Sequence, residues 1–395
     1  MSRSSRWRLA ALCAAASLAL SGCVSFAEQP PPPSWTTQPE LQPETGPDNG
    51  GGSNGPSGGS GSGGGGPNPP PASIPPPQGC KDFNPAVIGT CMDSLVAVAP
   101  FPNSDPPAGL VGERKSGNVM QVRAGSDPVK VTSIPVDSST DGGLIGLALS
   151  PSYGEDQLVY AYITTATDNR IVRFTAGDSP KPVLTGIPRG TTGNRGSLLL
   201  DRTGSLLLAT GNAGNPALAA DPKSLAGKLL RIDTQGKPAQ GNPDPGSAVI
   251  ASGFTAPAGI CIGIDGRPWV TNREPDRDAI YRIDPGKPLA NPAWNWPDKP
   301  GVAGCIVSPT VLMVATSTAG NLQNLPLNPE GVVTGKPTVS LDAKDGFGRL
   351  GGMAVLDPTL ALAGTTNKDG GTPISSDDRA VLIAINPSAA GGSKD

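Results

Sequence analysis

Eight polar residues of this sequence occupy positions from which side chains could bind a ligand. Each directly follows an apolar strand-like run or lies in the loop that faces one. Arginine and asparagine there can bind carboxylates and hydroxyl groups, and Glu274 could act as a base if burial raised its pKa. The alternative is that each is an ordinary solvated turn residue. The eight candidates for a ligand cleft are Asn194, Arg195, Asn212, Asn272, Arg273, Glu274, Arg349 and Asn367.

Several kinds of chemistry are excluded by composition. The chain contains no histidine, so a Ser-His-Asp triad cannot form. With no C-x-x-C pair either, and with an acidic stretch DRDAIYRID that lacks the spacing of a calcium loop, we predict no metal site. The 30 basic and 33 acidic residues give a net charge of −3 without a basic cluster. This balance predicts no nucleic-acid partner.

The six cysteines divide between the start of the chain and its body. Cys13 lies in an apolar leader and Cys23 directly follows that leader. An even number remains, which predicts two disulfides, in any of three pairings, if the compartment is oxidising: Cys80, Cys91, Cys261 and Cys305. A Cys80–Cys91 bond would staple the entry to the domain, and the later two cysteines would then tie two later segments. Four buried free thiols are the alternative.

The first 22 residues are typical of a secretory signal peptide. Arg3, Arg6 and Arg8 precede the apolar run from Leu9 to Leu20, which is too short to span a bilayer comfortably as a permanent helix. The run ends in Leu20-Ser21-Gly22-Cys23, which resembles a bacterial lipobox, where the cysteine receives a diacylglycerol. We therefore predict a lipoprotein anchored to the extracytoplasmic face of the cell membrane through Cys23. An ordinary signal peptide with a chance cysteine is the alternative.

Residues 23–79 are dominated by proline, glycine, serine and asparagine. A segment of this composition cannot bury enough apolar surface to offset its ordering entropy. We predict a disordered tether, with a reach of roughly 40 Å by flexible-coil scaling. The folded domain would then stand off the membrane.

Residues 80–390 read as a series of short apolar strands, and residues 391–395 as a tail. The recurring unit is an apolar strand, a tight turn, a second apolar strand, a polar loop and a third strand. "GLIGLALSPSYGEDQLVYAYITTATDNRIVRF" and "AGICIGIDGRPWVTNREPDRDAIYRID" are two clear copies. About six such units, 40–55 residues apart, predict an all-β, six-bladed β-propeller, with a β-sandwich or two smaller β domains as the alternatives. The eight polar candidates would then ring one mouth of the central channel.

One of these units also carries a family resemblance. Asp141-Gly142-Gly143, Gly146-Leu147-Ala148, the Tyr160/Tyr162 strand and Arg170–Phe174 are similar to the glucose/sorbosone dehydrogenase family, and "AGKLLRID" at 226–233 resembles a second signature of it. The similarity extends over about 109–387. The order of lipobox, Pro/Gly tail and propeller is also similar to that of an actinobacterial lipoprotein. The resemblance implies a six-bladed propeller and, for active members, pyrroloquinoline quinone (PQQ) and calcium.

The reaction residues of the family do not carry over. Its catalytic histidine falls on Gly193, with Asn194 retained and Arg195 in place of a glycine. Its Gly-x-Arg-Asn-Pro-x-Gly motif, which contacts the quinone, falls on 253–259, where Thr255 and Ala256 replace the cation and the amide. Glycine cannot accept a proton, so we expect no catalytic residue and no cofactor.

The expected function is therefore binding. We predict a catalytically degenerate, surface-tethered propeller that binds a carbohydrate or an envelope protein. A divergent PQQ- and calcium-dependent sugar or polyol dehydrogenase is the alternative, and a scaffold for envelope assembly is a third possibility.

Overall fold

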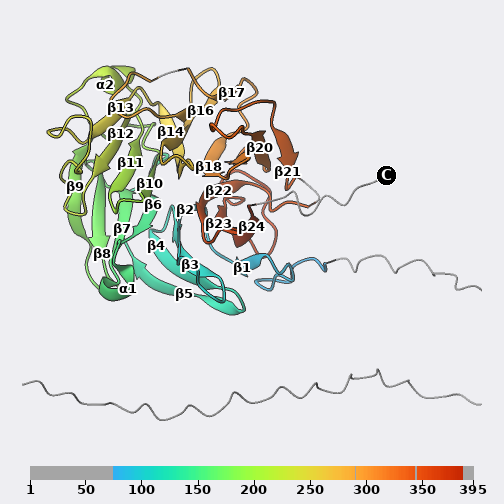
Figure 1. The fold of residues 1–395 in the computed structure, drawn as a ribbon. Coiled ribbons are helices and arrows are strands. Elements are labelled where there is room, and N and C mark those ends of the chain that lie inside the picture. The colour runs from blue at the N-terminus through green and yellow to red at the C-terminus, as the bar shows by residue number, and fades with distance from the viewer. Residues whose placement is uncertain (1–73, 290, 343–344, 386–395) are drawn as a thin grey trace, which may run out of the picture. The chain divides into compact units, whose positions relative to one another are not determined.

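The computed structural model describes residues 74–289, 291–342 and 345–385. The predicted signal peptide, Cys23, nearly all of the tether and the C-terminal tail lie outside the described residues. The described part of the chain forms six four-stranded antiparallel sheets. The first strands of neighbouring sheets contact one another in a closed ring, which gives a six-bladed β-propeller (Figure 1). The predicted fold class is confirmed.

Each blade is built outward from the channel by four strands (Figure 1). The innermost strands are β2 (Leu95–Pro100), β6 (Leu144–Leu149), β10 (Gly196–Leu200), β14 (Ala256–Ile262), β18 (Val302–Val307) and β22 (Leu350–Val355). The second strands are β3 (Ala108–Glu113), β7 (Val159–Thr164), β11 (Leu206–Thr210), β15 (Pro268–Arg273), β19 (Val311–Thr316) and β23 (Leu360–Thr365).

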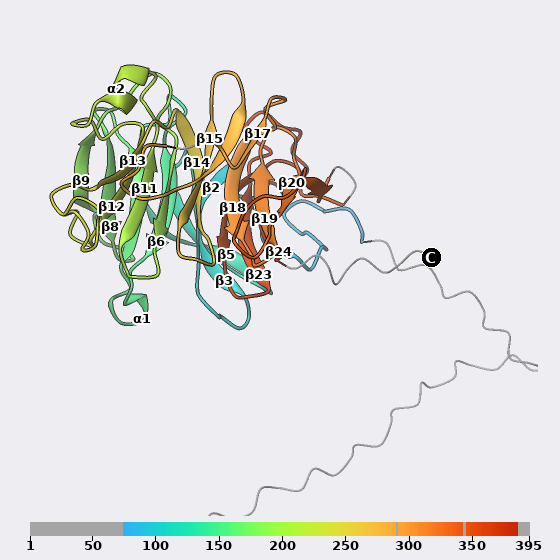
Figure 2. The ribbon, with the colours of Figure 1, turned by 45° about the horizontal axis from the view of Figure 1, so that its top comes forward.

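The third strands are β4 (Asn118–Arg123), β8 (Asn169–Phe174), β12 (Lys228–Ile232), β16 (Asp278–Arg282), β20 (Leu322–Pro326) and β24 (Ala380–Ala384). The outermost strands are β5 (Ser126–Ser133), β9 (Lys181–Ile187), β13 (Val249–Ser252), β17 (Trp294–Trp296), β21 (Thr338–Ser340) and, for the last blade, β1 (Val87–Gly89). Two short helices, α1 (Tyr153–Asp156) and α2 (Pro216–Ala220), lie at opposite ends of the strands (Figure 2). In the described ranges no helix has the length and apolar character needed to cross a bilayer.

The hydrophobic core is divided among the six interfaces between neighbouring blades. Leu110 of β3 packs in one cluster with Leu147 of β6, and Leu207 of β11 packs in another with Val270 of β15. The second strands β3, β7 and β11 are buried at every position. A single hairpin is marginal in water, so each blade depends on both neighbours for its burial.

The outermost strands were not expected from the sequence, which showed three strands per unit. They face solvent along much of their length, as in β5, where the side chains are mostly exposed. A strand that buries little apolar surface carries no alternating pattern to find.

The ring is closed by residues from the two ends of the domain. Strand β1 pairs with β24, and the backbone nitrogens and oxygens of Met92 and Asp378 exchange two hydrogen bonds of 3.0 and 2.8 Å. The buried Asp378 carboxylate accepts a third from the Ser94 nitrogen at 2.8 Å. Burial raises the pKa of Asp378, against the effect of the backbone N–H groups of Ser94, Asn367 and Lys368, which donate to its carboxylate. The last blade therefore contains strands from both ends.

Each disulfide joins two cysteines that follow one another in the sequence. Cys80 bonds to Cys91 and encloses β1, while Cys261 of β14 bonds to Cys305 of β18. The first bond holds the closing strand, and the second links the inner strands of two neighbouring blades.

Removal of the first disulfide should loosen the closure. We expect the double variant Cys80→Ser/Cys91→Ser to lower the free energy of unfolding by about 2–3 kcal/mol, because the unfolded chain regains the freedom of the short loop. Guanidinium titration of the variant and of the unaltered, oxidised protein measures this change. An unchanged midpoint, or free thiols at both positions of the unaltered protein in non-reducing mass mapping, would contradict it.

Candidate functional site

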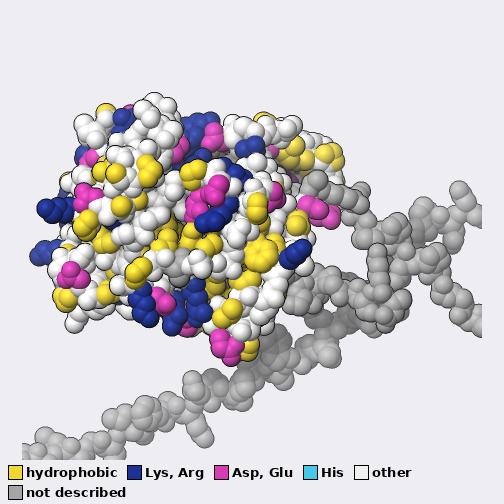
Figure 3. Space-filling model, turned by 90° about the horizontal axis from the view of Figure 1, so that it is seen from above, with side chains coloured by type: hydrophobic (Ala, Val, Ile, Leu, Met, Phe, Trp, Pro, Cys, Tyr) yellow, Lys and Arg dark blue, Asp and Glu magenta, His cyan; other side chains and the backbone are white. Residues whose placement is uncertain are grey.

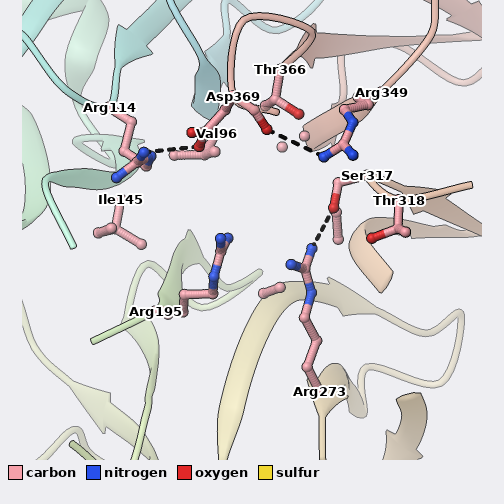
Figure 4. Close-up of a pocket in the computed structure, with 15 residues that line it drawn as sticks. Val96, Arg114, Ile145, Arg195, Arg273, Ser317, Thr318, Arg349, Thr366 and Asp369 are labelled. Atoms are coloured by element: carbon pink, nitrogen blue, oxygen red, sulfur yellow. Dashed lines mark hydrogen bonds and ion pairs between the residues drawn. The ribbon is translucent and has the colours of Figure 1, made fainter. Parts of the chain in front are cut away.

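A cavity of about 110 Å³ lies at the mouth of the channel where the innermost strands begin (Figure 4). Its side chains come from every blade and are mainly polar. Arginines dominate the set, joined by hydroxyl groups, one carboxylate and aliphatic groups. The larger ones are Arg114, Arg195, Arg273, Arg349, Ser317, Thr318, Thr366, Asp369, Val96 and Ile145, and Ala258, Ala303 and three glycines complete the lining. We call this cavity the arginine mouth.

The blade architecture explains why four arginines from distant segments meet. Arg114 directly follows β3 and Arg273 ends β15, so both stand at the end of a second strand. Arg195 and Arg349 directly precede the inner strands β10 and β22. In an antiparallel pair the end of one strand lies beside the start of its partner. All four positions therefore fall on the same rim.

Two of the arginines are fixed by contacts with the protein. The Arg273 guanidinium donates to the carbonyl oxygens of Val302 at 2.8 Å and Gly301 at 3.1 Å, and to Ser317 Oγ at 2.9 Å. Arg114 donates to the Gly142 carbonyl oxygen at 2.8 Å and forms an ion pair of 2.8 Å with Asp369.

The other two arginines are less engaged. Arg349 donates one terminal N–H to the backbone oxygen of Asp369 at 3.2 Å. The Arg195 side chain makes no hydrogen bond or ion pair with the residues that the structure describes, and it points into the cavity (Figure 4).

The mouth carries more positive than negative charge. Burial, together with the positive charge of Arg195, lowers the pKa of Arg273, and burial also lowers the pKa of Arg195. Burial opposes ionisation of Asp369, but Arg114 and Lys115 outweigh it and hold the pKa of that carboxyl below its ordinary value. These guanidinium charges lack full compensation, and an anion in the cavity would supply it.

Asp141 holds the loop that precedes β10. Its carboxylate accepts from the backbone nitrogens of Gly193 at 3.0 Å and Asn194 at 3.1 Å. Gly193 has φ +72°, and a Cβ atom added there would lie 2.6 Å from the backbone nitrogen of Gly214 and 2.9 Å from Asn212 Oδ1. The loop in this conformation has no room for a side chain at residue 193.

The structure brings three of the eight predicted cleft residues into the arginine mouth: Arg195, Arg273 and Arg349. The four asparagines are buried near the same rim and hold the loops together. Asn194 bonds to Asp141 and Thr140, Asn212 to Gly214, Asn272 to Thr255 and Ala256, and Asn367 to Arg349, Phe347 and Asp377.

Glu274 also lies outside the lining of the cavity. Its carboxylate accepts hydrogen bonds from Arg277, Tyr281 and Asn272. With both oxygens engaged by these donors, Glu274 is a structural anchor and is poorly placed to accept a proton from a ligand.

Arg114 and Asp369 were missed by sequence reasoning. Arg114 directly follows an apolar strand, so the rule that found Arg273 would have found it had the first, weaker repeat been treated like the others. No such rule exists for Asp369, which lies four residues beyond β23 and reaches the mouth through the course of its loop.

The opposite end of the channel has a different character. It opens into a mouth of about 460 Å³ lined mainly by aliphatic side chains from the ends of the inner strands, including Leu147, Ile260 and Ile306. Specific binding of a polar ligand needs converging polar groups, which the arginine mouth has and this apolar mouth lacks.

On the side of the molecule drawn in Figure 3, basic and acidic side chains lie interspersed among hydrophobic ones.

Among the described residues, no three acidic, cysteine or histidine side chains come together as a metal site. The arginine mouth is thus a set of cationic and hydroxyl donors, with one ion-paired carboxylate. Such a set can bind and orient an anion.

Comparison with known proteins places this site in a family context. The profile described as Glucose / Sorbosone dehydrogenase matches residues 93–299. The PQQ-bound aldose sugar dehydrogenase of Streptomyces coelicolor is 30% identical, with a TM-score of 0.70, over 75% of this chain and 95% of that one. No protein with a curated description matches the chain.

Two further solved structures share the fold. A putative oxidoreductase (glucose dehydrogenase) of Thermus thermophilus is 27% identical, with a TM-score of 0.66, over 75% of this chain and 98% of that one. The apo form of the soluble aldose sugar dehydrogenase of Escherichia coli is 18% identical, with a TM-score of 0.63, over the same shares.

The glycine at 193 provides a direct test of the loop geometry. We expect Gly193→Ala to lower the free energy of unfolding by about 1–3 kcal/mol, because the new Cβ would meet backbone in a left-handed conformation. Thermal or denaturant unfolding measures this. Gly177→Ala is the matched control, since Gly177 also has positive φ, at +83°, but has open space around it. Equal losses in the two variants would contradict the steric argument.

Proposed function

The chain belongs to the glucose/sorbosone dehydrogenase family, and on that premise we propose that it uses the family's propeller to bind an anionic ligand without oxidising it. The observation that carries this proposal is the pairing of a cation-rich mouth with a loop closed around Gly193. The mouth can hold acidic groups, and the loop offers no base to start a reaction.

The quinone of the family fits this site only in part. PQQ bears three carboxylates, and the four guanidiniums offer partners for them, although the cation of the 253–259 motif is missing. Sugar oxidation also needs a group that accepts the hydroxyl proton. Gly193 has none, and the Asp369 carboxylate is ion-paired with Arg114. The residues of this chain therefore support binding, and we derive no redox step from them.

The surroundings of the cations favour an acidic carbohydrate. Thr318 and Thr366 place hydroxyl groups on the wall of the cavity, where they can bond to ligand hydroxyls, and Val96 and Ile145 provide an apolar surface. A sugar acid presents carboxylate, hydroxyl and C–H groups, and so matches all three kinds of lining.

Loss of the Arg195 charge should weaken the binding of an acidic carbohydrate. We expect Arg195→Gln to reduce the affinity for glucarate, a sugar diacid, at least about tenfold, because a charge-assisted bond is lost. Calorimetric titration at fixed ionic strength measures the change. Arg123→Gln, which removes an arginine outside the mouth, is the control and should bind as the unaltered protein does.

A second titration with PQQ and calcium tests the alternative function. A divergent dehydrogenase would reduce a dye when given an aldose and both cofactors. Such activity would overturn the proposed function, and we expect none.

We also propose that the mature protein is a lipoprotein on the extracytoplasmic face of the cell membrane. The lipobox-like Leu20-Ser21-Gly22-Cys23 and the basic, apolar leader before it support this proposal. A lipid-anchored domain would meet its ligand in the envelope.

The lipid anchor can be tested by a substitution that removes the Cys23 sulfur atom. We expect Cys23→Ala to abolish lipidation and to move the protein from the detergent phase to the aqueous phase in phase-partitioning experiments, because acyl chains drive membrane binding. Cys13→Ala, which alters the leader's other cysteine, should leave partitioning unchanged. Detergent partitioning of the Cys23 variant would refute the anchor.

A further inference from the structure

We propose that the ligand of the arginine mouth carries two acidic groups at its two ends, and that Asp369 sets this number by keeping Arg114 from binding a third. This inference rests on the proposed function, since it specifies the ligand of the same site. It follows from the contacts that each of the four guanidiniums makes, or lacks, with the described residues.

Two guanidiniums are available to a ligand. The side chain of Arg195 has no partner among the described residues, and Arg349 uses one terminal nitrogen, toward a neutral carbonyl oxygen. Figure 4 shows these two side chains on opposite sides of the cavity. Each can form a two-pronged contact with a carboxylate. A ligand that satisfies both needs an acidic group at each end.

Arg273 is supported by the protein itself. Its guanidinium donates to the carbonyl oxygens of Gly301 and Val302. The backbone nitrogens of the same two residues donate to the buried carboxylate of Asp278, at 2.6 and 3.0 Å. These contacts hold Arg273 through Nε and one terminal nitrogen, so fewer of its donors than those of Arg195 remain for a ligand.

Arg114 is held by Asp369. The ion pair of 2.8 Å leaves the Asp369 carboxylate in the lining of the cavity, where it would repel a third acidic group. Lys115 approaches the second oxygen at 3.4 Å. The backbone oxygen of Asp369 also accepts from Arg349. Asp369 therefore both occupies one cation and positions another.

The hydroxyl groups on the wall of the cavity suit a polyhydroxy chain. Thr318 and Thr366 line the cavity on the side of Arg349 (Figure 4), where they can bond to hydroxyl groups of a ligand. An aldaric acid, with a carboxylate at each end and hydroxyl groups between, is the chemical class that fits.

Two matched pairs of ligands test the charge limit. Gluconate and glucarate share a six-carbon chain and differ by one acidic group. Glutarate and propane-1,2,3-tricarboxylate both carry carboxylates on a propane chain, and the second has one more. For the unaltered protein we expect glucarate to bind at least about tenfold more tightly than gluconate, and the tricarboxylate to bind no more tightly than glutarate. Calorimetric titrations at one pH and one ionic strength measure all four affinities.

The variant Asp369→Asn should allow the arginine mouth to bind a third acidic group. Because Arg114 becomes available and one negative charge is lost, we expect the tricarboxylate to bind at least about tenfold more tightly than glutarate in this variant. Asp369→Glu, which keeps the charge, should preserve the original order. Asp127→Asn makes the same charge change on the outermost strand β5 and should alter nothing.

The outcomes separate the two proposals. If no anion binds, or if Arg195→Gln leaves every affinity unchanged, the anion-binding function fails and this inference fails with it. If anions bind through Arg195 but Asp369→Asn leaves the order of dianion and trianion unchanged, only the charge limit is overturned. Thermal unfolding of each variant verifies that it is folded. If Asp369→Asn does not fold, Asp369→Glu still tests the charge limit. Tighter binding of the tricarboxylate than of glutarate by the glutamate variant would contradict that limit.

Discussion

The pairing of β1 with β24 is the contact on which the ring depends. Each interface between blades buries its own hydrophobic cluster, so a blade without a neighbour would expose one face to water. Closure makes the first and last blades neighbours, and it completes the set of six interfaces. The arginine mouth is a product of this closure, because its lining is drawn from all six blades. An open ring would separate Arg114 from Asp369, which belong to the first and last blades.

The framework of the propeller and the charged groups of the arginine mouth are built by different residues. The turns and strands that shape the rim are set by glycine, proline and aliphatic residues, which also build the cores between blades. The polar groups that face the cavity lie outside the hydrophobic clusters between blades, so their exchange would leave those clusters intact. Residue 193 is more constrained, because a Cβ atom added there would lie 2.6 Å from the backbone nitrogen of Gly214. A larger residue such as histidine would fit there only with a different course of the loop.

Sequence reasoning was most successful where burial leaves a periodic pattern. It found the inner strands, as in 144–149, and it placed Arg195, Arg273 and Arg349 on one rim, because strand ends in a repeated blade must coincide. It missed the outer strands, which are largely solvated. It also grouped Asn367 with the cleft residues, although that side chain is buried in a local hydrogen-bond network. The direction in which a loop side chain turns depends on its contacts in three dimensions, which strand spacing does not encode.

The Cys80–Cys91 bond has a mechanical consequence for a domain held by its N-terminal end. Tension that arrives along the chain at Cys80 has two covalent routes, one through the segment that contains β1 and one through the two sulfur atoms to Cys91. The second route is much shorter, so it becomes taut first and carries the load toward β2. The strand that closes the ring then lies on the slack branch. A propeller built in this way can be pulled from its N-terminal side without drawing β1 away from β24.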